Sequence, residues 1–171
     1  MIFRNDDLSF TSSAWHFKRV NDLFKKYGLK HHVAVLFENL FDNYEVADLL
    51  VGEENIVVNW HGWSWKHLKY GEMPYEHIVG DMRKSIDYWN TIAKRRYNSD
   101  KKIERCYPTW HCISDDFKRA SEDCGLIFDP RKELDEGVFV FHSWGYIRDE
   151  KFKQLEEWLI IHKERESQKP K

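Results

Sequence analysis

The chain alternates short apolar segments with longer segments of helical period, and this alternation restricts the fold more than any other feature. Apolar runs indicate strands at about 2–6, 32–37, 55–60, 103–107, 126–128 and 137–142. Helical spacing of apolar residues indicates helices at about 13–27, 40–50, 74–93, 114–124 and 150–165. Strands that alternate with helices pair in parallel through right-handed crossovers. The predicted fold class is α/β, either a small β/α barrel or an open α/β sheet.

The size and charge of the chain limit its organisation and its partners. A length of 171 residues is that of one domain, expected over 1–165, with a frayed tail at 166–171. Lys and Arg total 27 against 29 for Asp and Glu, so no excess of positive charge favours nucleic acid as a partner. No apolar run approaches the roughly 18 residues of a membrane span. The N-terminus has no signal-like pattern and the three cysteines show no CxxC spacing, so we expect a cytoplasmic protein.

Polar groups follow the predicted strands at the ends where parallel strands meet. Asp6 and Asp7 end the first strand, His61 follows the third, Arg105 lies in the fourth and His142 ends the last. Ligands of α/β folds bind beyond the carboxyl ends of the strands, so these residues predict a site at that rim. Adjacent carboxylates in a regular strand point to opposite sides, which favours different roles for the two aspartates. The alternative is that one of them caps the following turn.

The segment HGWSWKH at 61–67 places two imidazoles in a loop directly after a strand. Two histidines and a carboxylate form a three-ligand site with open positions for water, as in catalytic zinc centres. His77 is a spare candidate ligand, with a surface role as the alternative. His142 follows an apolar strand, so it is either a hydrogen-bonded core histidine or a general acid at the rim.

Four motifs in order along the chain resemble those of the polysaccharide deacetylase family with NodB-like homology. RNDD at 4–7 is similar to the motif that ends in Asp-Asp, and HGWSWKH at 61–67 to the paired-histidine motif. RCYPTW at 105–110 is similar to the Arg-and-Pro motif, and FHSWGY at 141–146 to the last motif. Asp129 matches the acidic fourth motif more loosely. The resemblance implies a distorted β/α barrel, incomplete in so short a chain, and a metal-dependent carbohydrate amidase or esterase.

The resemblance also implies a metal centre. Asp7, His61 and His67 match the ligand positions, for a divalent metal with zinc as the first candidate. The family spaces its two histidines about one helical turn apart, whereas His61 and His67 are separated by six positions. A non-catalytic carbohydrate-binding relative of the same fold is therefore the alternative to the enzyme.

The resemblance makes Asp6 the general base, Arg105 the group that orients Asp6, and His142 the general acid. The substrate would be an acylated carbohydrate, from which an N- or O-acyl group is hydrolysed. Indole rings in the same loops would stack on sugar rings; they belong to Trp63, Trp65, Trp110 and Trp144.

Two other metal chemistries fit the sequence less well. A hydrolase of phosphate esters would need a phosphate-binding loop, and the sequence offers no glycine-rich cradle. A structural metal site at Cys106, His111 and Cys112 is a second alternative, but adjacent His and Cys have poor geometry for shared coordination.

Overall fold

A computed structural model describes residues 2–66, 69–109, 113–131, 137–143 and 149–168. Every predicted strand and helix is present there within a few residues. The strands are β1 (Ile2–Leu8), β2 (His31–Leu36), β3 (Ile56–Gly62), β4 (Arg105–Cys106), β5 (Ile127–Phe128) and β6 (Val138–His142). The helices are α1 (Ala14–Tyr27), α2 (Tyr44–Gly52), α3 (Tyr75–Tyr97), α4 (Asp115–Asp123) and α5 (Asp149–Ser167), with 3₁₀ turns η1 (Leu40–Asp42) and η2 (Tyr70–Glu72).

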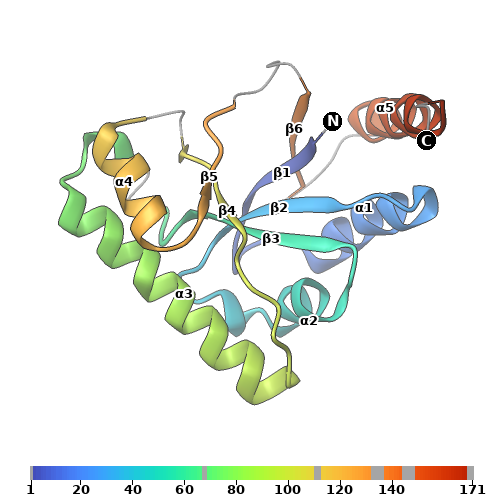
Figure 1. The fold of residues 1–171 in the computed structure, drawn as a ribbon. Coiled ribbons are helices and arrows are strands. Elements are labelled where there is room, and N and C mark those ends of the chain that lie inside the picture. Colours follow the sequence, from blue (N-terminus) through green and yellow to red (C-terminus); the bar gives the residue numbers. More distant parts are fainter. Residues whose placement is uncertain (1, 67–68, 110–112, 132–136, 144–148, 169–171) are drawn as a thin grey trace.

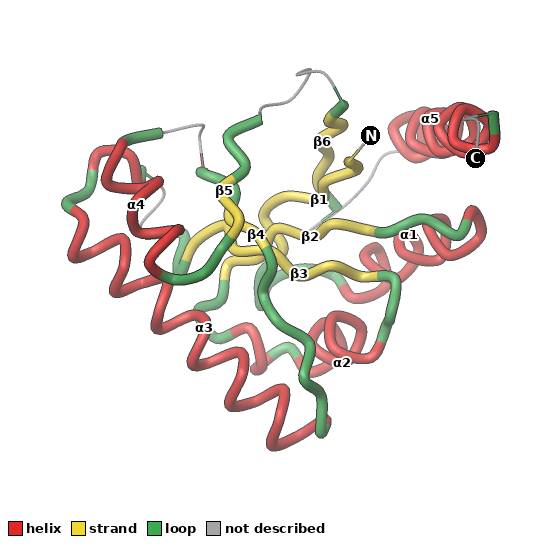
Figure 2. The backbone as a smooth tube through the Cα atoms, in the orientation of Figure 1, coloured by secondary structure: helices red, strands yellow, loops and turns green. Residues whose placement is uncertain are grey.

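The strands of the described ranges form one sheet in the order β5-β4-β3-β2-β1-β6. All of the pairings in it are parallel, which confirms the predicted α/β class. Figures 1 and 2 show the helices around the outside of the curved strands. β5 and β6 are the two edges of this sheet, and β1, the first strand of the chain, lies beside β6, the last. The architecture is an incomplete β/α barrel, as the sequence motifs implied.

Two helix boundaries differ from those expected. The helix predicted at 40–50 is divided into η1 and α2, because the Asn43 side chain accepts a hydrogen bond from the backbone N–H of Val46 and so caps a new helix. α5 continues to Ser167, two residues past the expected end of the domain. None of the helices in the described ranges combines the length and apolar character needed to cross a membrane.

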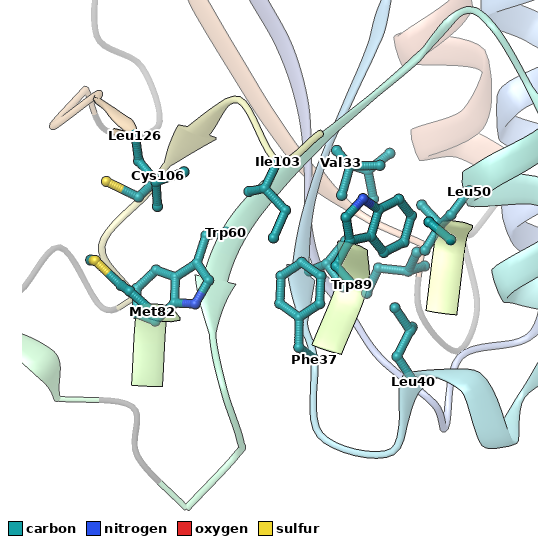
Figure 3. Close-up of a cluster of buried hydrophobic side chains, with 14 of the residues drawn as sticks. Val33, Phe37, Leu40, Leu50, Trp60, Met82, Trp89, Ile103, Cys106 and Leu126 are labelled. Carbon is teal, nitrogen blue, oxygen red and sulfur yellow. The ribbon is translucent and has the colours of Figure 1, made fainter. Parts of the chain in front are cut away.

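The main hydrophobic core lies between the outer face of the sheet and α2, α3 and α4 (Figure 3). Trp60 and Trp89 are fully buried in it. Each indole N–H has a partner, since Trp60 Nε1 donates to Ser85 Oγ at 2.9 Å and Trp89 Nε1 to the carbonyl oxygen of Lys101 at 2.7 Å. Two of the eight tryptophans therefore serve the core and do not line a cleft.

A second, smaller core packs α1 and α5 against β1 and β6, and a polar network crosses it. The fully buried His31 ring stacks on Phe24 with a centroid distance of 4.3 Å. Hydrogen bonds connect His31 through Asn21 to the residue before β3, and through Asn5 to the residue after β6. In order, the members are Asn55, Asn21, His31, Asn5 and Ser143. The network ties the first, second and last strands together beneath the site.

Candidate functional site

A bulge at the end of β1 brings both aspartates to one face of the sheet. The pairing of β1 with β2 is regular to Asn5 and shifts register before Leu8. Asp7 lies within this interval in the left-handed region, with φ of 64°. A bulge with a residue of positive φ re-aims the side chain that follows a regular strand. Asp7 can therefore reach the same site as Asp6, contrary to the expectation that adjacent carboxylates would point apart.

Asp7 lies between two histidines that come from different strands. Its Oδ1 is 3.3 Å from Nε2 of His61 on β3, and its Oδ2 is 3.3 Å from Nε2 of His142 on β6. Burial alone would raise the pKa of the Asp7 carboxyl, but the hydrogen bonds and charges of His142 and His61 outweigh it and hold that pKa well below its usual range. The three predicted strand-end residues are thus brought together around an ionised carboxylate.

The ring of His61 is held by the backbone of the neighbouring strand. Its Nδ1 is 2.9 Å from the carbonyl oxygen of Tyr107. A carbonyl oxygen can only accept, so Nδ1 carries a proton and, in the neutral ring, Nε2 is left with its lone pair toward Asp7. Two acceptors 3.3 Å apart repel unless a proton or a cation lies between them. A backbone carbonyl on the outer nitrogen is also the common second contact of a metal-binding histidine.

The guanidinium that holds Asp6 belongs to Arg4 and not to Arg105. Arg4 Nε donates to Asp6 Oδ1 at 2.7 Å and Arg4 Nη2 to Asp6 Oδ2 at 2.8 Å. Arg105 lies on β4, which β3 and β2 separate from β1, and its Nη1 is 3.8 Å from Asp129 Oδ2. Arg4 therefore orients Asp6 in the structure, where Arg105 was expected to do so. Arg4 and Asp6 are two positions apart on one strand, so their side chains lie on the same face.

Asp129, the looser match to a fourth motif, belongs to a cluster of its own. Arg131 donates to it through Nε at 2.8 Å and Nη2 at 2.6 Å. Burial opposes ionisation of Asp129, but the contacts with Arg131 and Arg105 dominate and lower its pKa. We place this cluster beside the site and assign no reacting role to it.

The aromatic candidates do not share one environment. Trp63 is half-buried, with its ring edge-on to Tyr88 and the Lys84 ammonium 3.8 Å from its ring centroid. Trp65 is 40% exposed and is available to a ligand. Five residues singled out in the sequence lie outside the described part of the chain: His67, Trp110, His111, Cys112 and Trp144.

The described residues hold only part of a metal-ligand set. Within the described ranges, the His, Cys, Asp and Glu side chains form no group of three or more that is arranged as a metal site. Asp7 and His61 supply two facing donors, and the third predicted ligand, His67, lies outside those ranges. His77 is exposed on α3 and lines a separate hollow of about 310 Å³ with Asp81 and Lys84.

Sequence reasoning missed Arg4 and Tyr107. Arg4 is a charged residue inside an apolar strand, and the period of two in a strand places it on the face of Asp6. That signal was available in the sequence. The contact of the Tyr107 carbonyl with His61 joins residues 46 positions apart and carries no local sequence signal.

The incomplete β/α barrel thus carries an acidic and histidine-containing cluster at the carboxyl rim of its parallel strands. No family model matches the sequence, and no curated protein matches it. Solved structures do: a CE4 family pseudoenzyme from Bacillus anthracis shares 13% identity with a TM-score of 0.70, over 96% of this chain and 61% of that one. A mutant of that pseudoenzyme with restored enzymatic activity has a TM-score of 0.73 at 14% identity, over 97% of this chain and 62% of that one.

Two structures described as an esterase and a deacetylase have a similar fold. A family 4 carbohydrate esterase from Streptomyces lividans has a TM-score of 0.72 at 10% identity, over 95% of this chain and 88% of that one. The peptidoglycan deacetylase PdaC from Bacillus subtilis has a TM-score of 0.67 at 13% identity, over 96% and 83%. This chain has the fold of the CE4 polysaccharide deacetylases, and it spans about 61–62% of the length of the pseudoenzyme chains.

Proposed function

We propose that the chain is a metal-dependent carbohydrate deacetylase, which hydrolyses an N- or O-acyl group from a saccharide. The observation that carries this proposal is the placement of Asp7 between His61 and His142, with Asp6 next to it in the bulge. The fold shared with carbohydrate esterases and deacetylases supports the same class of reaction.

The donor set fits a divalent cation such as zinc. Asp7 and His61 face each other with a carboxylate oxygen and an imidazole lone pair, and a cation between them would relieve their repulsion. His67 would be the third protein ligand, in the loop that follows β3. A divalent cation in such a site acts as a Lewis acid toward the acyl carbonyl and lowers the pKa of water.

Two further side chains would move protons. Asp6, held in place by Arg4, would take the proton from the attacking water as general base. Each of its oxygens accepts one hydrogen bond from Arg4 and keeps a second lone pair for that proton. His142, on the other side of Asp7, would give a proton from its ring to the departing sugar amine or hydroxyl.

The exposed indole of Trp65 and the solved structures with this fold support a carbohydrate as the substrate. Trp65 exposes an indole face in the loop after β3, where it would stack on a sugar ring. Relatives with this fold include a peptidoglycan N-acetylglucosamine deacetylase. We therefore propose an acylated saccharide as substrate, with N-acetylglucosamine oligosaccharides as the first probe.

The test combines metal analysis with acetate release. Purified protein is loaded with zinc, its metal content is measured, and acetate is assayed with N-acetylglucosamine oligosaccharides and an O-acetylated oligosaccharide. Asp6→Asn should abolish hydrolysis and keep the metal, whereas His61→Ala should lose the metal. Stoichiometric zinc with acetate release that depends on Asp6 supports the proposal. Sugar binding without zinc or acetate would instead identify a non-catalytic carbohydrate-binding relative.

A further inference from the structure

Arg4 has the geometry of a positioning residue for Asp6. It is only 1% exposed, and its Nε and Nη2 contact the two oxygens of one carboxylate. A fork of two parallel hydrogen bonds fixes the plane of a carboxylate as well as its position. The remaining nitrogen, Nη1, donates to the carbonyl oxygen of Arg131 at 3.0 Å, so the guanidinium is held at both ends.

Tyr107 contacts both the Arg4 guanidinium and the His61 ring. Its own ring lies against Arg4, with Cζ 4.4 Å from the ring centroid. Its carbonyl oxygen accepts the proton of His61 Nδ1 at 2.9 Å. Tyr107 is in turn fixed to β3, because its backbone N–H donates to the carbonyl oxygen of Trp60 at 2.9 Å. Tyr107 thus contacts both the arginine that holds Asp6 and the histidine beside Asp7.

We propose that Arg4 and Tyr107 are the positioning residues of this site, an inference that rests on the proposed deacetylase function. Arg4 orients the base Asp6 from the same strand. Tyr107 supports Arg4 through its ring and aims His61 through its carbonyl. Arg4 and Tyr107 together thereby set the distance between Asp6 and His61.

Arg105, the other arginine of the motifs, is placed differently. Its contact is with Asp129, whose oxygens also accept two hydrogen bonds from Arg131. Arg105 is part of a second ion cluster on the β4 and β5 side of the sheet, and Asp6 is held without it. Arg4 and Arg105 therefore have different partners, although the sequence motifs assigned the orienting role to Arg105.

The test is a matched pair of variants, Arg4→Lys and Arg105→Lys, assayed in zinc-loaded protein with N-acetylglucosamine oligosaccharides. Lysine keeps the positive charge but cannot donate the two parallel hydrogen bonds of a guanidinium. A base displaced by about 1 Å costs on the order of 100-fold in rate, so we expect Arg4→Lys to lower kcat by about that factor. Its KM and zinc content should stay within about twofold of the wild-type values. Arg105→Lys should change kcat by less than about threefold.

Tyr107 provides a second matched pair. Its hydroxyl makes no hydrogen bond with any described residue, so Tyr107→Phe keeps the ring and carbonyl contacts and its kcat is the reference for the variant that removes the ring. Tyr107→Leu removes the ring beneath Arg4 and should lower kcat by about tenfold or more, again with zinc retained. A merely structural role would lower the amount of folded protein and leave kcat per zinc-loaded molecule unchanged.

A readout that is independent of activity completes the experiment. In urea unfolding, Arg4→Met should shift the midpoint strongly in the wild-type background and weakly with Asp6→Asn, since the partner charge is then absent. Arg105→Met should shift it equally in both backgrounds. If the wild type is active and Arg4→Lys is equally active, the positioning role is wrong. The same holds if the midpoint shifts of Arg4→Met and Asp6→Asn are additive. Either result would leave the proposed function standing. Zinc-loaded wild-type protein that releases no acetate would overturn the proposed function and this inference with it.

Discussion

Acid should unfold this protein partly through His31, which lies at the start of β2, away from the carboxyl rim of the sheet. The ring is fully buried, its Nδ1 is 3.1 Å from Asn21 Oδ1 and its Nε2 is 3.4 Å from Asn5 Nδ2. The neutral ring satisfies both contacts, with Nδ1 as donor and Nε2 as acceptor. A second proton on Nε2 would face an amide donor, because the oxygen of Asn5 accepts from the backbone N–H of Ser143.

The size of the effect follows from the pKa of His31 in the two states. Burial, with a smaller contribution from the charge of His32, lowers it from 6.5 to about 3. Between these values the unfolded chain binds a proton that the native protein does not, so stability falls as the pH decreases below 6.5. Each pH unit in this window costs about 1.4 kcal/mol. The free energy of unfolding should therefore fall by roughly 2 kcal/mol from His31 alone between pH 6.5 and 4.5.

The assay is urea unfolding at several pH values for the wild type, His31→Gln and the control His77→Gln, whose histidine is exposed on α3. His31→Gln is less stable at pH 7, by about 1 kcal/mol for a weakened hydrogen bond, but its stability should fall less steeply with acid. The half-buried His32 has a pKa lowered to about 4 by burial and the charge of Arg105, and all three proteins share its contribution. Equal slopes for the wild type and His31→Gln would refute the reasoning.

The other predictions concern Gly62 at the end of β3, Lys101 beside the end of α2, and the exposed Trp65. A Cβ at Gly62 would lie 2.9 Å from Leu36 Cδ2 in a closely packed region, so Gly62→Ala should lower the unfolding free energy by about 1–3 kcal/mol in urea titrations. Lys101 donates to two carbonyl oxygens at the end of α2. Lys101→Met should therefore lower the unfolding free energy by about 1–2 kcal/mol. Substitution of its exposed neighbour, Lys102→Met, should leave the unfolding free energy unchanged in the same titration. Trp65→Ala should raise KM for an acylated oligosaccharide by about fivefold or more, from a stacking energy of ~1 kcal/mol, with an unchanged melting temperature. An unchanged KM would show that this ring does not bind the sugar.

Most of the fold was predictable because apolar periodicity and helix caps are local signals. The alternation of strands and helices fixed the parallel sheet, and the edges of each element were placed within a few residues. The break between η1 and α2 was missed, since Asn43 is a weak interruption in a sequence of otherwise helical period. The position of β1 between β2 and β6 required contacts between the two ends of the chain, which no local pattern contains.

The candidate site was predictable as a set of residues but not as a geometry. Asp7, His61 and His142 were expected at one rim because the carboxyl ends of parallel strands meet there. The bulge at Asp7 was not foreseen, because it depends on a register shift against β2. The pairing of Asp6 with Arg4 was overlooked in favour of Arg105, since the family resemblance outweighed the simpler argument that alternate residues of a strand share a face.

The neighbouring positions of β1 and β6 have a consequence for synthesis on the ribosome. During synthesis, β1 keeps one edge without its final partner until β6 has been translated. An open strand edge is prone to pair with other chains, so the nascent protein is exposed to aggregation during this interval. Docking of β6 is also the step at which His142 reaches Asp7.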